Sequence, residues 1–283
     1  MQQALKQIDS TPAAKAAPVP PRIEFRAVSK RYGSAGKADS VLAIDGLQLS
    51  IAPGEIVSVL GPTGCGKSSA LNLIAGFETP SSGAVLVDSR PVTGPGLDRA
   101  VVFQQPALFP WLRVIDNVTL GLKCRGAKPA DYLDRAHQLL ARVGLAHAAR
   151  RYPYQLSGGM RQRVQIARTL LGQPDILLMD EPFGALDYQT RLAMQELLLD
   201  LWSEFRPTVL FITHDVGEAV FVADRVVVLG RPGRVKHEVT VPAPKPRDRS
   251  FLTKPLFVEL QAQLLDAVQR EARLGLVSQV PNA

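Results

Sequence analysis

Cysteine is scarce in this chain of 283 residues, which contains only Cys65 and Cys124. The two form no CxxC pair and lack the spacing of a zinc-ligand set, so we expect neither a disulfide framework nor a cysteine-based metal site. The histidines are also few and widely separated in sequence, which gives no indication of a metal cluster: His137, His147, His214 and His237.

Long apolar runs are lacking as well. Purely apolar runs, such as residues 176–179, fall far short of the ~18 consecutive apolar residues that a membrane-spanning helix needs. The N-terminus has no apolar stretch of the kind found in secretion signals, and its alanine, proline and glutamine content predicts a disordered leader over residues 1–22. We therefore expect a protein that stays in the cytoplasm and reaches a membrane only through a partner.

Positive charge exceeds negative charge, with a formal net charge of +7. Much of the excess lies between Arg231 and Lys254, where seven lysines and arginines face two acids, Glu238 and Asp248. This basic stretch has two interpretations. It is either a solvated tail or a segment that approaches anionic lipid headgroups beneath a membrane protein.

Strand-like and helix-like segments alternate along most of the chain. Half-buried or buried strands are expected at residues 23–27, 47–51, 55–60, 84–87, 100–103, 176–179, 208–213 and 225–229, and helices at 69–76 and 159–171. Strand patterns disappear over about 106–163, which predicts an inserted helical subdomain. The alternation predicts an α/β fold with a mainly parallel sheet covered by helices.

Residues 241–283 form a separate unit in this interpretation, following a main domain over 23–240. They begin as a proline-rich basic linker. They end in an amphipathic helix, whose predicted apolar stripe is Leu256, Leu260, Leu264 and Val268.

The sequence GPTGCGKS at residues 61–68 matches the phosphate-loop pattern GxxxxGK[ST]. Glycines let the backbone curl so that amide N–H groups point at phosphate oxygens, and the following helix presents its positive dipole end to the same anion. A lysine supplies charge to the β and γ phosphates, and a serine hydroxyl can ligate Mg²⁺. The predicted ATP contacts in this loop are Gly61, Pro62, Thr63, Gly64, Cys65, Gly66, Lys67, Ser68 and Ser69.

A second site signal is the sequence ILLMDE at residues 176–181. Four apolar residues indicate a buried strand, and two carboxylates follow at its C-terminal end, where parallel sheets place their ligand sites. Asp180 is the candidate Mg²⁺ residue. Glu181 is the candidate catalytic base that orients and polarises the attacking water.

The sequence LSGGMRQR at residues 156–163 narrows the class, because it resembles the signature sequence of ABC transporter ATPases. Ser157, Gly158 and Gly159 precede a helix whose free N–H groups make a second anion site. In the family, two subunits pair head to tail, and the signature of one closes over the γ-phosphate held by the phosphate loop of the other. The resemblance covers about residues 23–239. It implies a phosphate-loop NTPase cassette with an N-terminal antiparallel β region.

The resemblance assigns four further residues by their place in the motifs. Gln104 matches the glutamine that contacts Mg²⁺ and senses the γ-phosphate; Gln105 fits the pattern less well. Asp187 ends the GALD segment that crosses the dimer interface. His214 matches the switch histidine, a catalytic group that contacts the γ-phosphate. Tyr32 lies where the family stacks an aromatic ring on adenine.

Longer stretches resemble importers, and among these the nitrate, sulfonate and taurine subfamily: VFQQPALFPWL at 102–112, DEPFGALD at 180–187 and THDVGEA at 213–219. In such proteins the segment after Gln104 receives a helix of the permease. Phe109, Pro110 and Trp111 are candidates for that contact, although Trp111 could instead pack within the helical subdomain.

The resemblance implies an ATP- and Mg²⁺-dependent homodimer at the cytoplasmic face of the bacterial inner membrane. Its expected partners are transmembrane permease subunits and a periplasmic solute-binding protein, with taurine, another sulfonate or nitrate as solute. An importer for an unrelated solute is the alternative. A nucleic-acid ATPase does not fit, because only 89 residues separate Lys67 from Ser157 and they show no heptads for the coiled coil of that class. No nucleic-acid partner is therefore expected.

Overall fold

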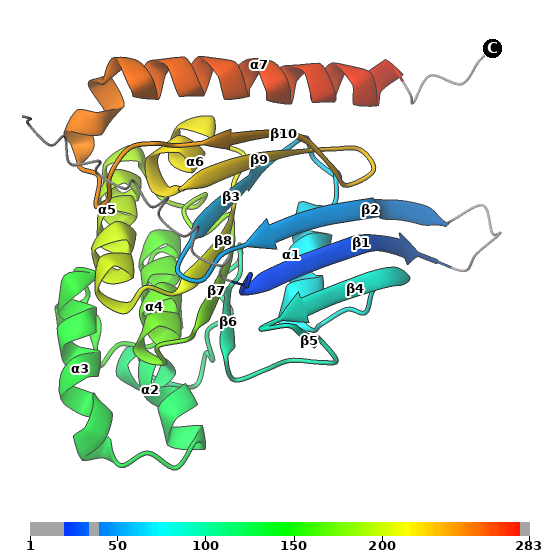
Figure 1. Ribbon diagram of the computed structural model, residues 1–283. Coiled ribbons are helices and arrows are strands. Elements are labelled where there is room, and N and C mark those ends of the chain that lie inside the picture. Colours follow the sequence, from blue (N-terminus) through cyan, green and yellow to red (C-terminus); the bar gives the residue numbers. More distant parts are fainter. Residues whose placement is uncertain (1–19, 34–39, 278–283) are drawn as a thin grey trace, which may run out of the picture.

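The computed structural model describes residues 20–33 and 40–277 (Figure 1). Most of the predicted leader and the greater part of the loop after Tyr32 lie outside these residues. Within the described ranges, no helix is both long enough and apolar enough to cross a membrane.

A six-stranded sheet forms the centre of the molecule, in the order β10-β9-β3-β8-β7-β6. The five strands from β9 to β6 pair in parallel, and only β10 runs antiparallel, against β9. The prediction of a mainly parallel core sheet is confirmed. The strands are β3 (Ile56–Leu60), β6 (Arg99–Val102), β7 (Ile176–Asp180), β8 (Thr208–Ile212), β9 (Arg225–Gly230) and β10 (Arg234–Thr240).

A smaller antiparallel sheet, ordered β2-β1-β4-β5, lies to one side (Figure 1). Its first two strands are longer than predicted. Pairing between β1 and β2 shifts register after Phe25, and Ala27 has a positive φ of 46°, so a bulge interrupts the alternation on which the prediction relied. The strands are β1 (Ile23–Tyr32), β2 (Val41–Ile51), β4 (Ser82–Val87) and β5 (Arg90–Pro91).

Two apolar cores flank the central sheet. Helix α1 (Lys67–Ala75) lies between the two sheets and shares one core with strands from both. The other core joins the opposite face of the central sheet to the remaining helices. Of these, α5 (Tyr188–Phe205) follows β7, and α6 (Val216–Val222) follows β8. Because a helix returns the chain after each parallel strand, the loops that leave β3, β7 and β8 all lie at the carboxyl ends of the strands.

Helices replace strands between β6 and β7, as predicted. Helix α2 (Val114–Cys124) and helix α3 (Pro129–Arg142) pack against α4 (Gly158–Leu171), which also contacts β6. Two short 3₁₀ turns, Ala146–Ala148 and Pro153–Gln155, connect α3 to α4.

The C-terminal segment packs against the cassette. After a 3₁₀ turn at Arg249–Thr253, helix α7 (Pro255–Val277) lies along β9, β10 and α6 (Figure 1). Of its predicted stripe, Leu260 and Leu264 are buried, while Leu256 and Val268 pack against the same core from partly buried positions.

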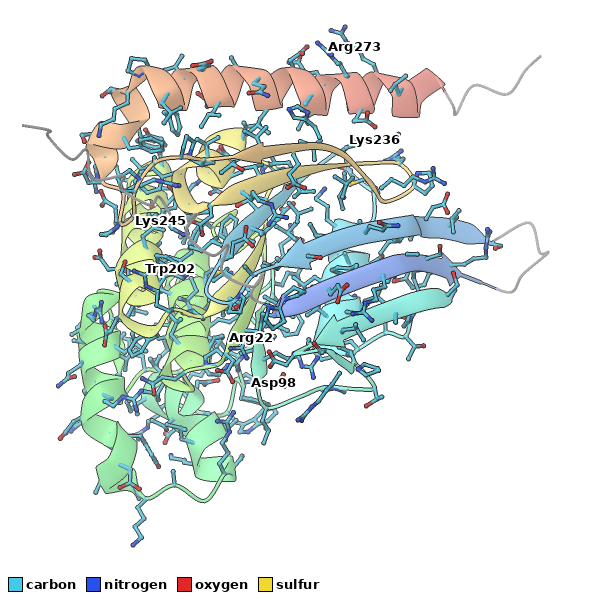
Figure 2. The ribbon with its side chains drawn as sticks, in the orientation of Figure 1. Arg22, Asp98, Trp202, Lys236, Lys245 and Arg273 are labelled. Carbon is cyan, nitrogen blue, oxygen red and sulfur yellow. The ribbon has the colours of Figure 1, made fainter. Side chains whose placement is uncertain are left out.

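Two cations of the basic stretch, Lys245 and Arg247, pack against the cassette. Neither the solvated-tail nor the lipid-headgroup interpretation of the stretch predicted this role. The Lys245 ammonium lies 3.6 Å from the centre of the Trp202 ring and 2.6 Å from the Asp224 carboxylate (Figure 2). Its burial lowers its pKa to about 8. The buried guanidinium of Arg247 donates hydrogen bonds to five backbone carbonyls, of Val220, Phe221, Ala223, Val241 and Ala243. These contacts hold the chain between β10 and α7 against the cassette.

Candidate nucleotide site

The phosphate loop, residues 61–66, joins β3 to α1. A Cβ atom at Gly61 would collide with the Leu229 carbonyl and the Cys65 sulfur, and Gly66 has a φ of 97°, so both positions require glycine. Cys65 is fully buried beneath the loop, and burial raises the pKa of its thiol. Cys65 is therefore a packing residue whose side chain lies under the loop, and both cysteines are free.

The Lys67 ammonium lies within the curl of this loop. It donates hydrogen bonds to the carbonyl oxygens of Gly61 at 2.8 Å and Pro62 at 3.2 Å. Around it is a hollow of about 590 Å³, which is also lined by loop residues, by Ala43 and by three side chains from other elements. A cation at the start of a helix, with a glycine-rich backbone around it, fits a phosphate group.

Asp180, the last residue of β7, has a carboxylate that contacts Ser68, the residue directly after Lys67. It accepts a hydrogen bond from Ser68, and burial raises its pKa, although the Ser68 bond acts in the opposite direction. Mg²⁺ prefers oxygen ligands and is commonly held by one or two carboxylates together with substrate phosphates. The Asp180–Ser68 pair beside the loop therefore fits that ion.

Three side chains meet at the mouth of the hollow, where β6, β7 and β8 end. One carboxylate oxygen of Glu181 accepts a hydrogen bond from the Gln104 amide at 2.9 Å and lies 3.2 Å from Nδ1 of His214. Glu181 itself adopts a positive φ of 45°, a conformation uncommon for a residue with a side chain. The candidate base and the candidate switch histidine, 33 positions apart in sequence, are thus in contact.

Helix α4 holds the segment that carries Gln104. Buried Gln165 donates a hydrogen bond to the Phe103 carbonyl at 2.9 Å and accepts one from the Ala107 backbone at 2.8 Å. Gln162 donates to the same Phe103 carbonyl. The helix that begins at the signature sequence therefore fixes the backbone on both sides of Gln104. Gln104 and Gln105 are both exposed, and Gln104 is the one that lines the hollow.

Tyr32 lies at the end of β1 beside the phosphate loop. Its hydroxyl donates a hydrogen bond to Ser69 Oγ at 3.2 Å, and the ammonium of Lys30 lies 4.9 Å from its ring centre. These contacts place an aromatic ring next to the start of α1, while the loop after Tyr32 lies mostly outside the described residues.

The signature residues are not part of the hollow within one chain. Ser157 is the N-cap of α4, where its hydroxyl accepts a hydrogen bond from the Met160 amide at 3.2 Å. Ser157 and Gly158 are exposed, and Gly159 packs its backbone against Leu186. The chain therefore has two phosphate-type helix ends, of which only one is surrounded by other site residues.

Asp187 is the N-cap of α5 and accepts a hydrogen bond from the Thr190 amide at 3.0 Å. That bond is the main cause of a lowered pKa for the Asp187 carboxyl. The side chain lies outside the hollow, like those of the signature.

An apolar groove of about 490 Å³ lies between the Gln104 segment, α2 and α4. Phe109 lines it, and Trp111 stands beside Phe109 with ring centres 5.6 Å apart. Trp111 is 70% exposed, so the alternative in which it packs in the core of the helical subdomain is wrong.

The sequence did not single out several residues that brace this site. They contact the site through backbone carbonyls or through other side chains, which helix periodicity does not reveal. These residues are buried Gln165 and Glu218 and half-buried Arg191.

Comparison with known proteins agrees with this geometry. A family model described as "ABC transporter" matches residues 44–184. The taurine import ATP-binding protein TauB of Chromobacterium violaceum is 49% identical over 84% of this chain and 92% of its own length. The nitrate import ATP-binding protein NrtD of Synechocystis is 49% identical over 77% and 84%, respectively.

Solved structures show the same architecture. A dimeric structure of MJ0796, described as a bacterial ABC transporter cassette, superposes with a TM-score of 0.71 at 34% identity, and the match covers 78% of this chain and all of that one. Another structure of the same cassette, bound to ADP and phosphate, gives a TM-score of 0.70. With its phosphate loop, signature helix and matching relatives, the chain belongs to the ABC transporter family, as an ATP-binding cassette.

Proposed function

We propose that this chain is the ATP-hydrolysing subunit of an ABC import system and works as a head-to-tail homodimer. One observation carries the proposal: Gln104, Glu181 and His214 meet at the mouth of the phosphate loop, while the signature end of α4 lies outside that hollow. The first group suits ATP hydrolysis. The second is free to complete the site of another copy.

Within one copy, the phosphate loop and Lys67 bind the β and γ phosphates. Their amide and ammonium donors neutralise charge that would otherwise repel an attacking oxygen. Tyr32 stacks on the adenine, held beside the loop by its bond to Ser69. Ser68, Asp180 and Gln104 would hold Mg²⁺, which would neutralise further phosphate charge.

Glu181 acts as the general base and accepts a proton from the attacking water. Gln104 and His214, which share one of its carboxylate oxygens, fix the direction of that carboxylate. His214 also contacts the γ-phosphate and stabilises the charge that develops during transfer. Catalysis is therefore mainly positioning and electrostatic stabilisation.

Two copies enclose two ATP molecules. Ser157, Gly158 and Gly159 of each copy present N–H groups to the γ-phosphate bound by Lys67 of the other, and the Asp187 segments cross between them. ATP binding closes the pair, and loss of the γ-phosphate removes the group that joined them. The closing motion moves the helical subdomains.

The groove beside Gln104 is the proposed binding site for a partner protein. It receives a helix of a transmembrane permease, with exposed Phe109 and Trp111 as contacts. The system includes a periplasmic solute-binding protein and takes up taurine, another sulfonate or nitrate, as the names of the relatives suggest. The cassette then lies at the cytoplasmic face of the bacterial inner membrane.

Affinity purification of the tagged chain from native membranes in mild detergent, followed by mass spectrometry, tests this function. Recovery of a polytopic permease and a binding protein is expected, and ligand assays on that binding protein then identify the solute. Recovery of the chain without either, or with DNA or ribosomes, would contradict import while leaving ATP hydrolysis intact.

A further inference from the structure

Two loops of the nucleotide site leave neighbouring strands. Strands β7 and β8 are parallel partners, so the loops that follow them leave the same edge of the sheet. The loop after β7 (residues 181–187) carries Glu181 and Asp187. The loop after β8 (residues 213–215) carries His214. The Glu181–His214 contact joins the two loops at one end.

Arg191, in the first turn of α5, joins them at the other end. Its guanidinium donates a hydrogen bond to the Leu186 carbonyl at 3.2 Å, in the first loop. It also donates to the Asp215 carboxylate at 3.3 Å, in the second. A third nitrogen, Nε, lies 3.7 Å from Glu218 on α6. One planar cation therefore contacts both loops and the helix after the second.

Glu218 extends this contact to His214. Its carboxylate is 6% exposed and accepts a hydrogen bond from the Thr213 hydroxyl at 2.6 Å. The same hydroxyl accepts a bond from the Asp215 amide at 3.0 Å, so the backbone is held on both sides of His214. Burial raises the pKa of Glu218, and nearby Arg191 favours its ionised form.

These contacts make a closed ring: Glu181, the loop to Leu186, Arg191, Glu218, Thr213, His214 and back to Glu181. A loop held at one end can rotate, whereas two loops held at both ends keep a fixed separation. Asp187 lies beside this ring at the proposed dimer face, so a movement of its loop reaches the backbone around His214 through Arg191 and its partners Asp215 and Glu218.

We propose that Arg191 is a positioning residue, which sets His214 against Glu181 by clamping the Asp187 loop to the His214 loop. The proposal rests on the proposed ATP hydrolysis by this site. It goes beyond that function by assigning the coupling of the two loops to one side chain that lies outside the nucleotide hollow.

Arg191→Gln tests the clamp, because glutamine is polar but carries no charge and cannot reach the Leu186 carbonyl, Asp215 and Glu218 together. Arg249→Gln is the matched control. Arg249 forms an ion pair at 3.3 Å with Glu196, which lies on α5 as Arg191 does but outside the ring. We expect Arg191→Gln to lower kcat by about tenfold with ATP affinity within about twofold, and the control to change neither. A variant that melts earlier but keeps its kcat would overturn the proposal.

The second measurement observes His214 directly. The chain has four histidines, so its imidazole NMR signals are few, and His214→Ala assigns the one of interest. Arg191→Gln should shift the His214 signal and leave those of His137 and His147 in place. An unchanged His214 signal would overturn the proposal. This readout needs no turnover, so an inactive wild-type chain would contradict the proposed function alone.

A second pair of variants keeps the test decisive if Arg191→Gln does not fold. Thr213→Val preserves shape but removes the hydroxyl that links Glu218 to the His214 backbone, whereas Thr213→Ser retains it. We expect Thr213→Val to reproduce the loss in kcat and the shift of the His214 signal. Thr213→Ser should keep the kcat and the His214 signal of the wild type. Equal behaviour of the two variants would contradict the clamp.

Discussion

The phosphate loop and the signature segment are both glycine-containing helix N-termini, yet their surroundings differ. At the first, Lys67 is enclosed by its own loop, and Gln104, Glu181 and His214 line the same hollow. At the second, Ser157 is exposed, and among the residues that the structure describes its side chain bonds to the backbone of its own helix.

The phosphate loop therefore has the side chains that a bound nucleotide needs, whereas the signature end has free amide donors but no phosphate beside them. An exposed helix N-terminus leaves amide donors without protein acceptors. ATP held by the phosphate loop would offer its γ-phosphate to these donors, but within a single chain the two helix ends are not brought together. In our proposal a second copy brings them together, which makes hydrolysis depend on dimerisation although binding does not.

Lys67→Ala should have the largest effect on ATP binding, because it removes the cation from the enclosed end. We expect ATP affinity to fall by about a hundredfold or more, since a charge-assisted bond to phosphate is lost in a partly buried site. Isothermal titration with ATP measures this. Ser157→Ala, at the other end, is the control and should leave the affinity of one chain unchanged.

Glu181→Gln should separate binding from chemistry at the enclosed end. The amide keeps the size of the side chain but cannot take a proton, so turnover should fall about 10²- to 10⁴-fold while ATP still binds. Phosphate release and ATP titration on the same preparation give the two numbers. Substantial residual turnover would mean that another group is the base.

Ser157→Arg should sharpen the comparison from the exposed end. A bulky cation at the N-cap fills the space into which a second copy would bring its phosphate, and it removes the N-cap bond. We expect turnover to fall by about tenfold or more, with binding to a single chain preserved. If ATP affinity falls as steeply as in Lys67→Ala, the signature end also contributes to ATP binding by a single chain, contrary to our proposal.

Arg247→Met should have the smallest effect on turnover, because Arg247 contacts neither end. Five backbone carbonyls would lose their donor, so the free energy of unfolding should fall by about 2–4 kcal/mol. Chemical denaturation measures the loss, and kcat at a temperature where the variant is folded should match the wild type. A large kcat loss would connect the C-terminal segment to catalysis.

The sequence predicted the parts of the fold whose causes are local. Helix α1 begins at Lys67 and ends before Gly76, which has a φ of 77° and caps it, because the glycines around it determine both ends. The strands β7 and β8 were predicted from their buried apolar runs. The parallel sheet then follows from the alternation of such elements.

Other features depend on contacts between distant parts of the chain. The bulge at Ala27 is set by pairing with β2 and β4, and alternation in β1 alone ends there. Lys245 and Arg247 were expected either in a solvated tail or near lipid headgroups, because Trp202, Asp224 and the carbonyls at the end of α6 lie 20 or more positions away. Arg191 was missed for the same reason. Its role depends on two loops that only the folded sheet brings together.

The shared site is tested most directly by the solution mass of Glu181→Gln, measured by size exclusion with light scattering. We expect 30.7 kDa without ATP and twice that mass with ATP and Mg²⁺. Adding Ser157→Arg to Glu181→Gln should keep the mass at the monomer value while ATP still binds. A Glu181→Gln chain that binds ATP yet remains monomeric, or a double variant that dimerises equally well, would contradict a site shared between two copies.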